Sequence, residues 1–386
     1  MHILHVISSL DPAQGGPPVV VSRLAAAQQE RGHHVDVLAH AGTDDRTRIH
    51  DMIGSLPGNG LQHVHLLERG GVMEQLRAKH SRAWLREHVG RYELVHLHGI
   101  WDPILNNAAQ EAAHAGTDWI ITPHGMLDPW CMSQGRLRKR VALAAWARKM
   151  LSGSRFIHAL NHDEELGMKP HVGSARIEVI PNGVFLEELE PLPPAGTFRS
   201  RHQGLCLDTK PFVLFLSRLH YKKGLDILVA AFERIHDEIP ELDLVIAGPD
   251  DGYETTLQSL IEASPARNRM HCIGPLYGED KLAALVDCNC FCLPSRQEGF
   301  SMAITEALGC GTPVIITEAC HFPEVADTGA GLVTSLDAAA VAEAMLQLAS
   351  SPETCEQMGR AGASLVRDHY TWPAIAARLD TALGLK

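Results

Sequence analysis

The chain has 386 residues, of which 45% are hydrophobic and 21% are charged. This length suits two domains of roughly 150–200 residues each, and the composition excludes a disordered or fibrous protein. The formal net charge of −12 argues against general nucleic-acid binding, which requires a basic surface. No apolar run approaches the ~20 residues of a membrane-spanning helix. The N-terminal segment is typical of a buried strand rather than a signal peptide, so we expect a cytoplasmic protein.

Short apolar runs alternate with helical patterns through the first half of the chain. Helical periodicity is clear at Val19–Gln29 and at Val72–His88. Strands that alternate with helices predict a parallel sheet built from β-α-β units. The runs expected to form strands are Ile3–Ile7, Val35–Leu38, Val64–Leu67, Leu94–Leu97, Trp119–Thr122, Phe156–Leu160 and Ile177–Ile180.

The periodicity fails around Phe185–Lys210, where Glu-Leu-Glu-Pro-Leu-Pro-Pro-Ala-Gly has the composition of a linker. It resumes with a second set of strands and with an amphipathic helix at Leu225–Ile239. The sequence therefore predicts an α/β protein with two doubly wound, Rossmann-like domains, 1–190 and 191–370, each with a parallel sheet. The expected strands of the second domain are Pro211–Ser217, Leu242–Ala247, Met270–Ile273, Cys290–Leu293, Pro313–Thr317 and Gly331–Val333.

The strongest functional signal follows the expected strand Cys290–Leu293. A helix that begins near Ser301 would turn its first backbone N–H groups toward a ligand. Glu298 precedes this helix and Glu306 lies inside it, so both carboxylates could accept hydrogen bonds from the vicinal hydroxyl groups of a sugar or ribose. An ordinary surface helix with a glycine-rich entry is the alternative. The backbone positions concerned are Gly299, Phe300, Ser301 and Met302.

A pair of basic residues follows the expected strand Pro211–Ser217. Arg218 and Lys223 lie on the loop that leads to the next helix. Arginine offers a planar fork of donors and lysine a point charge, and the two together suit a diphosphate. The alternative is a pair of solvated loop charges.

Together these two blocks resemble the retaining glycosyltransferases of family 4, which have the GT-B fold: two Rossmann-like domains that face a central cleft. Glu298 and Glu306 match the E-x7-E motif of that family, and Arg218 and Lys223 match its basic pair. Four further matches occur in the family's order, and the resemblance covers nearly the whole chain. They are Gly15-Gly16 (the N-terminal glycine loop), Thr122-Pro-His124-Gly125 (the donor-sugar histidine), Ile180-Pro-Asn-Gly-Val184 (the end of the first domain) and Tyr370-Thr-Trp372 (the aromatic motif before the last helix).

The resemblance implies a role for each matching residue of the second domain, 191–370, which would bind a nucleotide-sugar donor. Arg218 and Lys223 would bind the donor diphosphate, Glu306 the ribose and Glu298 the sugar hydroxyls. Tyr277, in the turn Gly274-Pro-Leu-Tyr-Gly278, would flank the base, although a plain turn aromatic explains it equally well.

The first domain, 1–190, would bind the acceptor, and a C-terminal helix at about 371–386 would pack back on it. Gly15 and Gly16 would let the backbone approach the diphosphate or the acceptor closely. His124 would contact the donor sugar near the reacting bond, and His98 and Trp101 are candidates for the acceptor side. No histidine pair is accompanied by converging cysteine or carboxylate ligands, so we expect no metal and no cofactor.

The stretch Trp130–Arg155 carries seven basic residues and no acidic one. Apolar residues interleave with the basic ones from Leu137, which predicts a basic, partly amphipathic helix. One interpretation is a surface helix packed on its own sheet. The other is peripheral contact of 136–155 with an anionic membrane or a phosphate-bearing acceptor.

The sequence thus predicts a metal-independent, retaining hexosyltransferase. The donor would be a UDP- or GDP-sugar and the acceptor a glycan or lipid-linked molecule, in surface or exopolysaccharide biosynthesis. The alternatives are a sugar-nucleotide epimerase of the same fold and a non-catalytic nucleotide-sugar-binding protein. A dehydrogenase is disfavoured because no G-x-G-x-x-G follows a strand.

Overall fold

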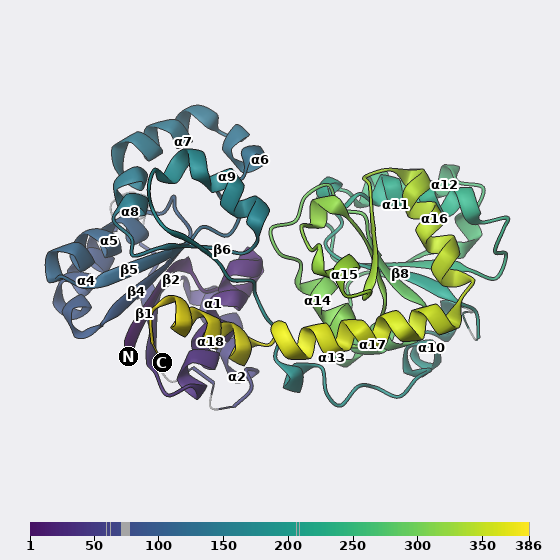
Figure 1. Ribbon diagram of the computed structural model, residues 1–386, viewed down its shortest axis with the longest axis horizontal. Coiled ribbons are helices and arrows are strands. Elements are labelled where there is room, and N and C mark those ends of the chain that lie inside the picture. The colour runs from purple at the N-terminus through teal and green to yellow at the C-terminus, as the bar shows by residue number, and fades with distance from the viewer. Residues whose placement is uncertain (59, 62, 71–77, 206, 208, 386) are drawn as a thin grey trace. The chain divides into compact units, whose positions relative to one another are not determined.

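The computed structural model describes residues 1–385 except 59, 62, 71–77, 206 and 208. The chain divides into two units, the first formed by Met1–Asn182 with Trp372–Lys386 and the second by Gly183–Thr371 (Figure 1). The sequence placed the boundary after residue 190, whereas 183–190 belong to the second unit. The acceptor and donor roles assigned to the two domains stay predictions.

The first unit contains a seven-stranded sheet in the order β3-β2-β1-β4-β5-β6-β7. All of its pairings are parallel, as the alternation of strands and helices predicted. Every apolar run of the first half that was expected to form a strand does so. The strands are β1 (His2–Ser9), β2 (His34–Ala41), β3 (His63–Glu68), β4 (Leu94–His98), β5 (Asp118–Thr122), β6 (Ile157–Ala159) and β7 (Ile177–Val179).

Helices connect these strands, and the last helix of the chain also belongs to the first unit. Of the expected helix at Val72–His88, α4 covers Lys79–His88, and residues 72–77 lie outside the described residues. The C-terminal helix α18 (Trp372–Ala382) packs on α1, where Asp380 contacts Arg31 and His33 at 2.7 and 2.9 Å. The other helices are α1 (Gly16–Glu30), α2 (Thr43–Gly54), α5 (Pro103–Ala115), α6 (Pro129–Ser133), α7 (Arg136–Ala142), α8 (Arg148–Ser152) and α9 (His162–Val172), with a π-helical turn at Leu143–Ala147 between α7 and α8.

The second unit contains a six-stranded parallel sheet in the order β10-β9-β8-β11-β12-β13. Its strands are β8 (Phe212–Leu216), β9 (Asp243–Ala247), β10 (Met270–Cys272), β11 (Cys290–Leu293), β12 (Val314–Thr317) and β13 (Gly331–Thr334). Its helices are α10 (Thr197–Arg201), α11 (Leu225–Ile235), α12 (Glu254–Ala263), α13 (Gly278–Asp287), α14 (Met302–Gly309), α15 (Glu324–Asp327), α16 (Ala338–Ala349) and α17 (Pro352–His369).

The segment expected to be a linker, Phe185–Lys210, contributes to the core of the second unit instead. It contains the short helix α10, and Leu189 and Phe198 are buried in that core. Their apolar side chains stabilise this position by leaving water, an effect that a proline-rich composition does not reveal.

In each sheet the chain builds strands outward in one direction and then returns to the middle to build in the other. The two strands at this switch point are β1 and β4 in the first sheet, and β8 and β11 in the second. In doubly wound sheets, ligands bind outside the carboxyl ends of the strands at this switch point. Gly15 and Gly16 lie where the loop after β1 leads into α1, His98 ends β4, and Trp101 follows it. The loops after β8 and β11 carry Arg218, Lys223 and Glu298. The topology therefore places most of the sequence-predicted residues at the switch point of their own sheet.

Candidate functional site

Lys223 and Glu298 form a buried ion pair at the switch point of the second unit. The Nζ of Lys223 lies 2.7 and 2.9 Å from the two carboxylate oxygens of Glu298. The side chains are only 13% and 8% exposed, and Ser295 donates a further hydrogen bond to Glu298. The sequence paired Lys223 with Arg218, but the folded chain holds it against Glu298.

Glu306, inside α14, forms a second ion pair. Its carboxylate lies 2.8 Å from the Nζ of Lys281, which comes from α13. Helix α14 begins at Met302 after Ser301, as the sequence predicted, so the backbone N–H groups of its first turn lie between the two glutamates along the chain. Lys281 was not singled out from the sequence, because nothing in its spacing relates it to Glu306.

Arg218 and Tyr277 are the most exposed of the predicted donor residues. The Arg218 side chain is 61% exposed and its guanidinium contacts Asp251 at 2.6 Å. Tyr277, 71% exposed, precedes α13. An exposed ion pair contributes little stability, so Arg218 can exchange Asp251 for an incoming anion at small cost.

The loops that carry Lys223 and Glu298 touch at Gly224. This residue has φ +69°, and a Cβ atom there would lie 1.9 Å from the carbonyl oxygen of Pro294. Only glycine permits both the left-handed backbone and this approach. Gly224 therefore brings the basic loop after β8 against the acidic loop after β11.

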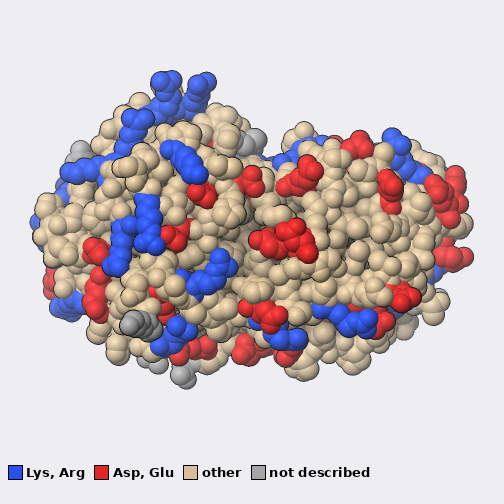
Figure 2. Space-filling model, viewed as in Figure 1, with Lys and Arg blue, Asp and Glu red and all other residues tan. Residues whose placement is uncertain are grey.

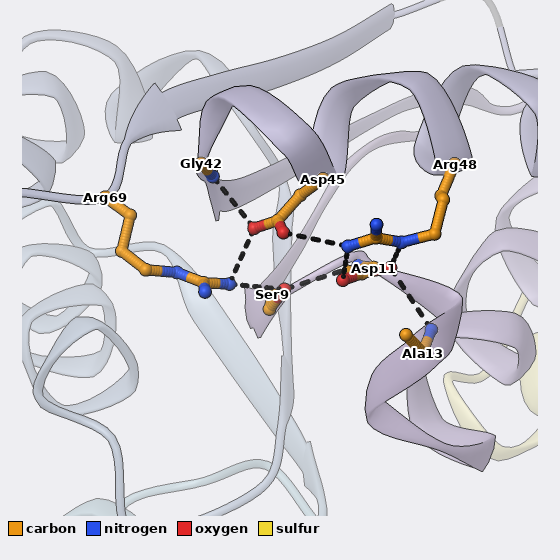
Figure 3. A network of polar contacts seen from close by, with 7 residues as sticks. All are labelled: Ser9, Asp11, Ala13, Gly42, Asp45, Arg48 and Arg69. Carbon is orange, nitrogen blue, oxygen red and sulfur yellow. Dashed lines mark hydrogen bonds and ion pairs between the residues drawn. The ribbon is translucent and has the colours of Figure 1, made fainter.

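A network of ion pairs holds the loop after β1 in the first unit (Figure 3). Arg48 donates two hydrogen bonds to Asp11, at 2.8 and 2.6 Å, and one to Asp45. Asp45 also contacts Arg69 at 2.9 Å, and the Arg48 guanidinium lowers the pKa of Asp11. The network lies close in sequence to Gly15 and Gly16. Apart from the neighbouring residues in the chain, no atom of the described residues lies within 4 Å of where a Cβ of either glycine would be. No sequence pattern indicated the network, because its members come from separate elements.

A layer of buried histidines lies at the carboxyl side of the first sheet. His5, His96, His98 and His158 are each at most 3% exposed. The Nδ1 of His5 and the Nε2 of His98 lie 2.8 Å apart, and the Nδ1 of His98 lies 3.1 Å from the Nε2 of His124. Burial is the main cause that lowers the pKa of each ring, to about 4 for His5 and His158 and to about 3 for His124. These histidines are therefore neutral near pH 7.

His124 is held in an unusual backbone conformation. Its φ of +54° is uncommon for a residue other than glycine, and Gly125 follows with φ +73°. The buried carboxylate of Glu164 accepts the N–H groups of Gly125 and Leu160, each at 2.6 Å. Burial raises the pKa of Glu164 to about 7. Glu164, which the sequence analysis missed, therefore fixes the loop that carries His124.

Three of the histidines could in principle hold a metal ion. The ligand nitrogens of His5, His96 and His98 lie within 4.8 Å of one another. Two nitrogens on one tetrahedral Zn²⁺ lie about 3.3 Å apart, given Zn–N bonds of about 2.05 Å. The 2.8 Å between His5 and His98 instead favours a hydrogen bond. The absence of a metal stays a prediction.

Comparison with known proteins decides the family. Residues 198–365 match the model described as "Glycosyl transferases group 1", and residues 15–183 match "Glycosyl transferase 4-like domain". The chain belongs to the group 1 glycosyltransferases. The resemblance noted from the sequence is thereby confirmed, and with it the GT-B fold.

Relatives of this glycosyltransferase span most of its length. Phosphatidyl-myo-inositol mannosyltransferase of Mycobacterium leprae is 27% identical over 385 residues, covering 95% of this chain and 91% of that protein. One subunit of the human phosphatidylinositol N-acetylglucosaminyltransferase is 25% identical, covering 96% and 73%. A GDP-mannose-dependent mannosyltransferase of Corynebacterium glutamicum is 29% identical, but only 53% of this chain and 55% of that protein align.

Solved structures share the fold. The Anabaena protein HepE, crystallised in complex with UDP and glucose, has a TM-score of 0.78 at 19% identity and covers 100% of this chain and 99% of its own. WaaG, a glycosyltransferase involved in lipopolysaccharide biosynthesis, has a TM-score of 0.71 at 17% identity, with 99% and 100% covered. Among the described residues of the glycosyltransferase, no helix has the length and hydropathy needed to span a membrane.

Substitution of Gly224 tests the contact between the two loops of the second unit. Gly224→Ala should destabilise this unit by more than ~2 kcal/mol, because it adds a steric clash to the ~1–2 kcal/mol of a left-handed alanine. Gly252→Ala is the matched control, since Gly252 has φ +85° and no atom within 4 Å of its Cβ position. Thermal unfolding followed by circular dichroism measures both. Equal losses in the two variants would contradict the contact.

The histidine layer predicts that the first unit loses stability in acid. In the unfolded chain these rings take up protons below pH ~6.5, whereas the folded chain resists until about pH 4, so stability falls as the pH drops through this window. Each ring lowers the free energy of unfolding by up to ~1.4 kcal/mol for each pH unit within this window. Glu164 has a raised pKa and acts in the opposite direction, but it offsets the effect of only one ring.

Tryptophan fluorescence can follow this acid sensitivity selectively, because all six tryptophans fall in the first unit. Urea midpoints should fall steeply between pH 6.5 and 4.5, and less steeply in His158→Phe. Midpoints that do not change with pH would show that the layer is charged or exposed.

Proposed function

We propose that this glycosyltransferase moves a hexose-type sugar, with retention and without a metal, from a UDP- or GDP-sugar to a glycan or lipid-linked acceptor in surface polysaccharide biosynthesis. The observation that carries the proposal is the pair of lysine–glutamate contacts on either side of the N-terminus of α14. Lys223–Glu298 and Lys281–Glu306 combine cations for phosphate with carboxylates for hydroxyl groups. A nucleotide sugar presents both kinds of group.

The diphosphate would contact Lys223, Arg218 and the first backbone N–H groups of α14. The ammonium group of Lys223 contacts both carboxylate oxygens of Glu298, and it has three donors, so it would still have one to offer a phosphate oxygen. Negative charge grows on the β-phosphate as the sugar leaves. These fixed donors would stabilise it in place of a metal ion.

Retention is consistent with attack on the same face of the sugar from which the phosphate leaves. Glu298 is held by Lys223 and Ser295, which does not suit a free nucleophile. His124 is neutral near pH 7 because burial lowers its pKa to about 3, so it would bind a sugar hydroxyl rather than donate a charge. The departing phosphate would accept the proton of the acceptor hydroxyl.

The acceptor side of the proposal is supported by the basic stretch of the first unit. Four arginine side chains make no hydrogen bond or ion pair with any residue that the structure describes, although the chain as a whole is acidic: Arg136, Arg138, Arg140 and Arg148. Lys and Arg side chains gather over α7 in Figure 2. On the same helix Leu137 and Val141 are 76% and 59% exposed. Unpaired guanidinium groups beside exposed apolar side chains suit an anionic lipid surface.

A cavity of about 670 Å³ opens beside this helix. Its lining includes Arg136, Arg140 and Arg148, with Met132 and Leu143 as apolar neighbours. A phosphate-bearing acceptor with an apolar part would fit this combination. The names of the mannosyltransferase and N-acetylglucosaminyltransferase relatives, which specify phosphatidylinositol, favour the lipid-linked class of acceptor over a free glycan.

An epimerase is the second candidate, because a putative UDP-N-acetylglucosamine 2-epimerase of Listeria monocytogenes shares the fold with a TM-score of 0.63 at 13% identity. The two activities differ in product. Incubation with a nucleotide sugar alone would give an epimerised nucleotide sugar in one case, and slow hydrolysis or no reaction in the other.

The two glutamates should separate in binding and turnover. Glu306→Gln should weaken the affinity for free UDP or GDP about tenfold or more, since a hydrogen bond to a charged group contributes roughly 1.5–3 kcal/mol. Glu298→Gln and His124→Ala should spare that affinity and lower kcat, because their partner is the sugar. Calorimetry and a transfer assay with and without a chelator measure these effects. Glu343→Gln, on the exposed face of α16, is the control, and equal affinity losses in all three site variants would contradict the assignment.

Membrane recruitment should depend on α7. Arg136/Arg138/Arg140→Ala should weaken binding to vesicles that contain phosphatidylglycerol by about 100-fold at low salt, because each basic residue contributes ~1 kcal/mol. Lys139 stays in place because it donates to the carbonyl oxygen of Cys131 and lies over Trp101. Arg234/Arg267/Arg360→Ala removes equal charge from the second unit as a control. If wild type stays in the supernatant, recruitment is wrong and the arginines serve a soluble acidic acceptor.

A further inference from the structure

A continuous chain of hydrogen bonds runs from the interior of the first unit to His124. It begins at the side-chain amide of Gln28 on α1, whose Oε1 lies 2.7 Å from the Nε2 of His5. It continues from His5 to His98 at 2.8 Å and from His98 to His124 at 3.1 Å. Gln28 and His5 are 0% exposed and His98 is 3% exposed. The chain therefore connects a buried amide to the loop after β5.

In this chain, His5 and His98 each form hydrogen bonds through both ring nitrogens, whereas His124 does so only through its Nε2. A neutral imidazole has one N–H donor and one acceptor nitrogen, so each hydrogen bond between rings requires the two protons to point the same way along the chain. Only two arrangements satisfy all three contacts. Either every ring donates toward Gln28, or every ring donates toward His124.

The amide of Gln28 selects between these arrangements. Its oxygen faces His5, and its Nε2 is buried with no hydrogen-bond partner among the described residues. In this orientation of the amide the oxygen can only accept, so the Nε2 of His5 carries the proton. The Nδ1 of His5 then accepts from the Nε2 of His98, and the Nδ1 of His98 accepts from the Nε2 of His124. This leaves the Nδ1 of His124, which is outside the chain, as a hydrogen-bond acceptor.

We propose that Gln28, His5 and His98 are positioning residues that fix the tautomer of His124, so that its Nδ1 accepts a hydrogen bond from a hydroxyl group of the donor sugar. This inference rests on the proposed contact of His124 with that sugar. Gln28 lies on the first helix and His124 beyond the fifth strand, so no sequence motif links them. Burial lowers the pKa of His98, as it does for His5 and His124, and so keeps the whole chain neutral.

A second chain in the same layer serves as an internal control. His158 donates from Nε2 to the carbonyl oxygen of Ile180, so its Nδ1 accepts from Thr122, whose oxygen in turn accepts from the Nε2 of His96. A backbone carbonyl fixes the direction of this chain, and it does not include His124. Thr122→Val removes the two buried hydrogen bonds of this hydroxyl group, with His96 and with His158, and none of those in the first chain.

Nitrogen NMR of the full-length protein with ¹⁵N-labelled histidine tests the tautomer directly. The signals of His124 are identified by their loss in His124→Ala. We expect a protonated Nε2 and an unprotonated Nδ1 in wild type, and a mixture of tautomers in Gln28→Leu or, should that variant fold poorly, in Gln28→Met. A protonated Nδ1 in wild type, or an unchanged spectrum in the folded Gln28 variants, would overturn the proposal.

Kinetics then separate positioning from a structural role. Gln28→Leu should lower kcat about three- to tenfold, the value of one neutral hydrogen bond, with unchanged affinity for free UDP or GDP. It should have no further effect in a His124→Ala background, because the partner through which it acts is gone. Thr122→Val should leave the ¹⁵N signals of His124 unchanged, because its hydroxyl group lies outside the first chain. If Gln28→Leu lowers kcat equally in wild type and in His124→Ala, its role is structural. If His124→Ala alone has normal kcat while the spectrum is as expected, only the proposed contact of His124 with the sugar is refuted.

Discussion

Parallel pairing of β1 with β4 and of β8 with β11 is the constraint on which the candidate site residues of each unit depend. Parallel strands end at the same edge of a sheet, so loops that are distant in sequence begin side by side. At this point the connections lead to opposite faces and leave room between them. The loops after β8 and β11 then touch at Gly224, and the ion pair of Lys223 with Glu298 follows from that contact.

Burial changes the chemistry of the residues that these loops hold. Lys223 is charged but only 13% exposed, and a buried charge is tolerated only when it is paired and hydrogen-bonded. The buried histidines of the first unit avoid an unpaired charge in a different way: they remain neutral and form hydrogen bonds with one another. The second unit thus holds a paired charge and the first unit a set of uncharged hydrogen-bonding rings.

The two glutamates of the E-x7-E motif illustrate how such a site is assembled. Each is matched with a lysine from a different element: Lys223 from the loop before α11 and Lys281 from α13. The carboxylates are therefore oriented before any ligand arrives, which lowers the entropy lost on binding. The basic stretch of the first unit has the opposite character, because the side chains of Arg136, Arg138, Arg140 and Arg148 are exposed and have no partner among the described residues.

The sequence by itself determined the strands, the parallel sheets and the family, because apolar runs, helical periodicity and motif order are properties of local sequence. Helix α14, with Glu306 inside it and Glu298 before it, was predictable for the same reason. Only the tertiary structure decided that Leu189 and Phe198 belong to a core rather than a linker, and that Arg218 contacts Asp251. It also decided the partners Lys281, Glu164 and Gln28. These contacts join elements that are far apart along the chain, and which side chains meet there depends on packing and burial that no local pattern encodes.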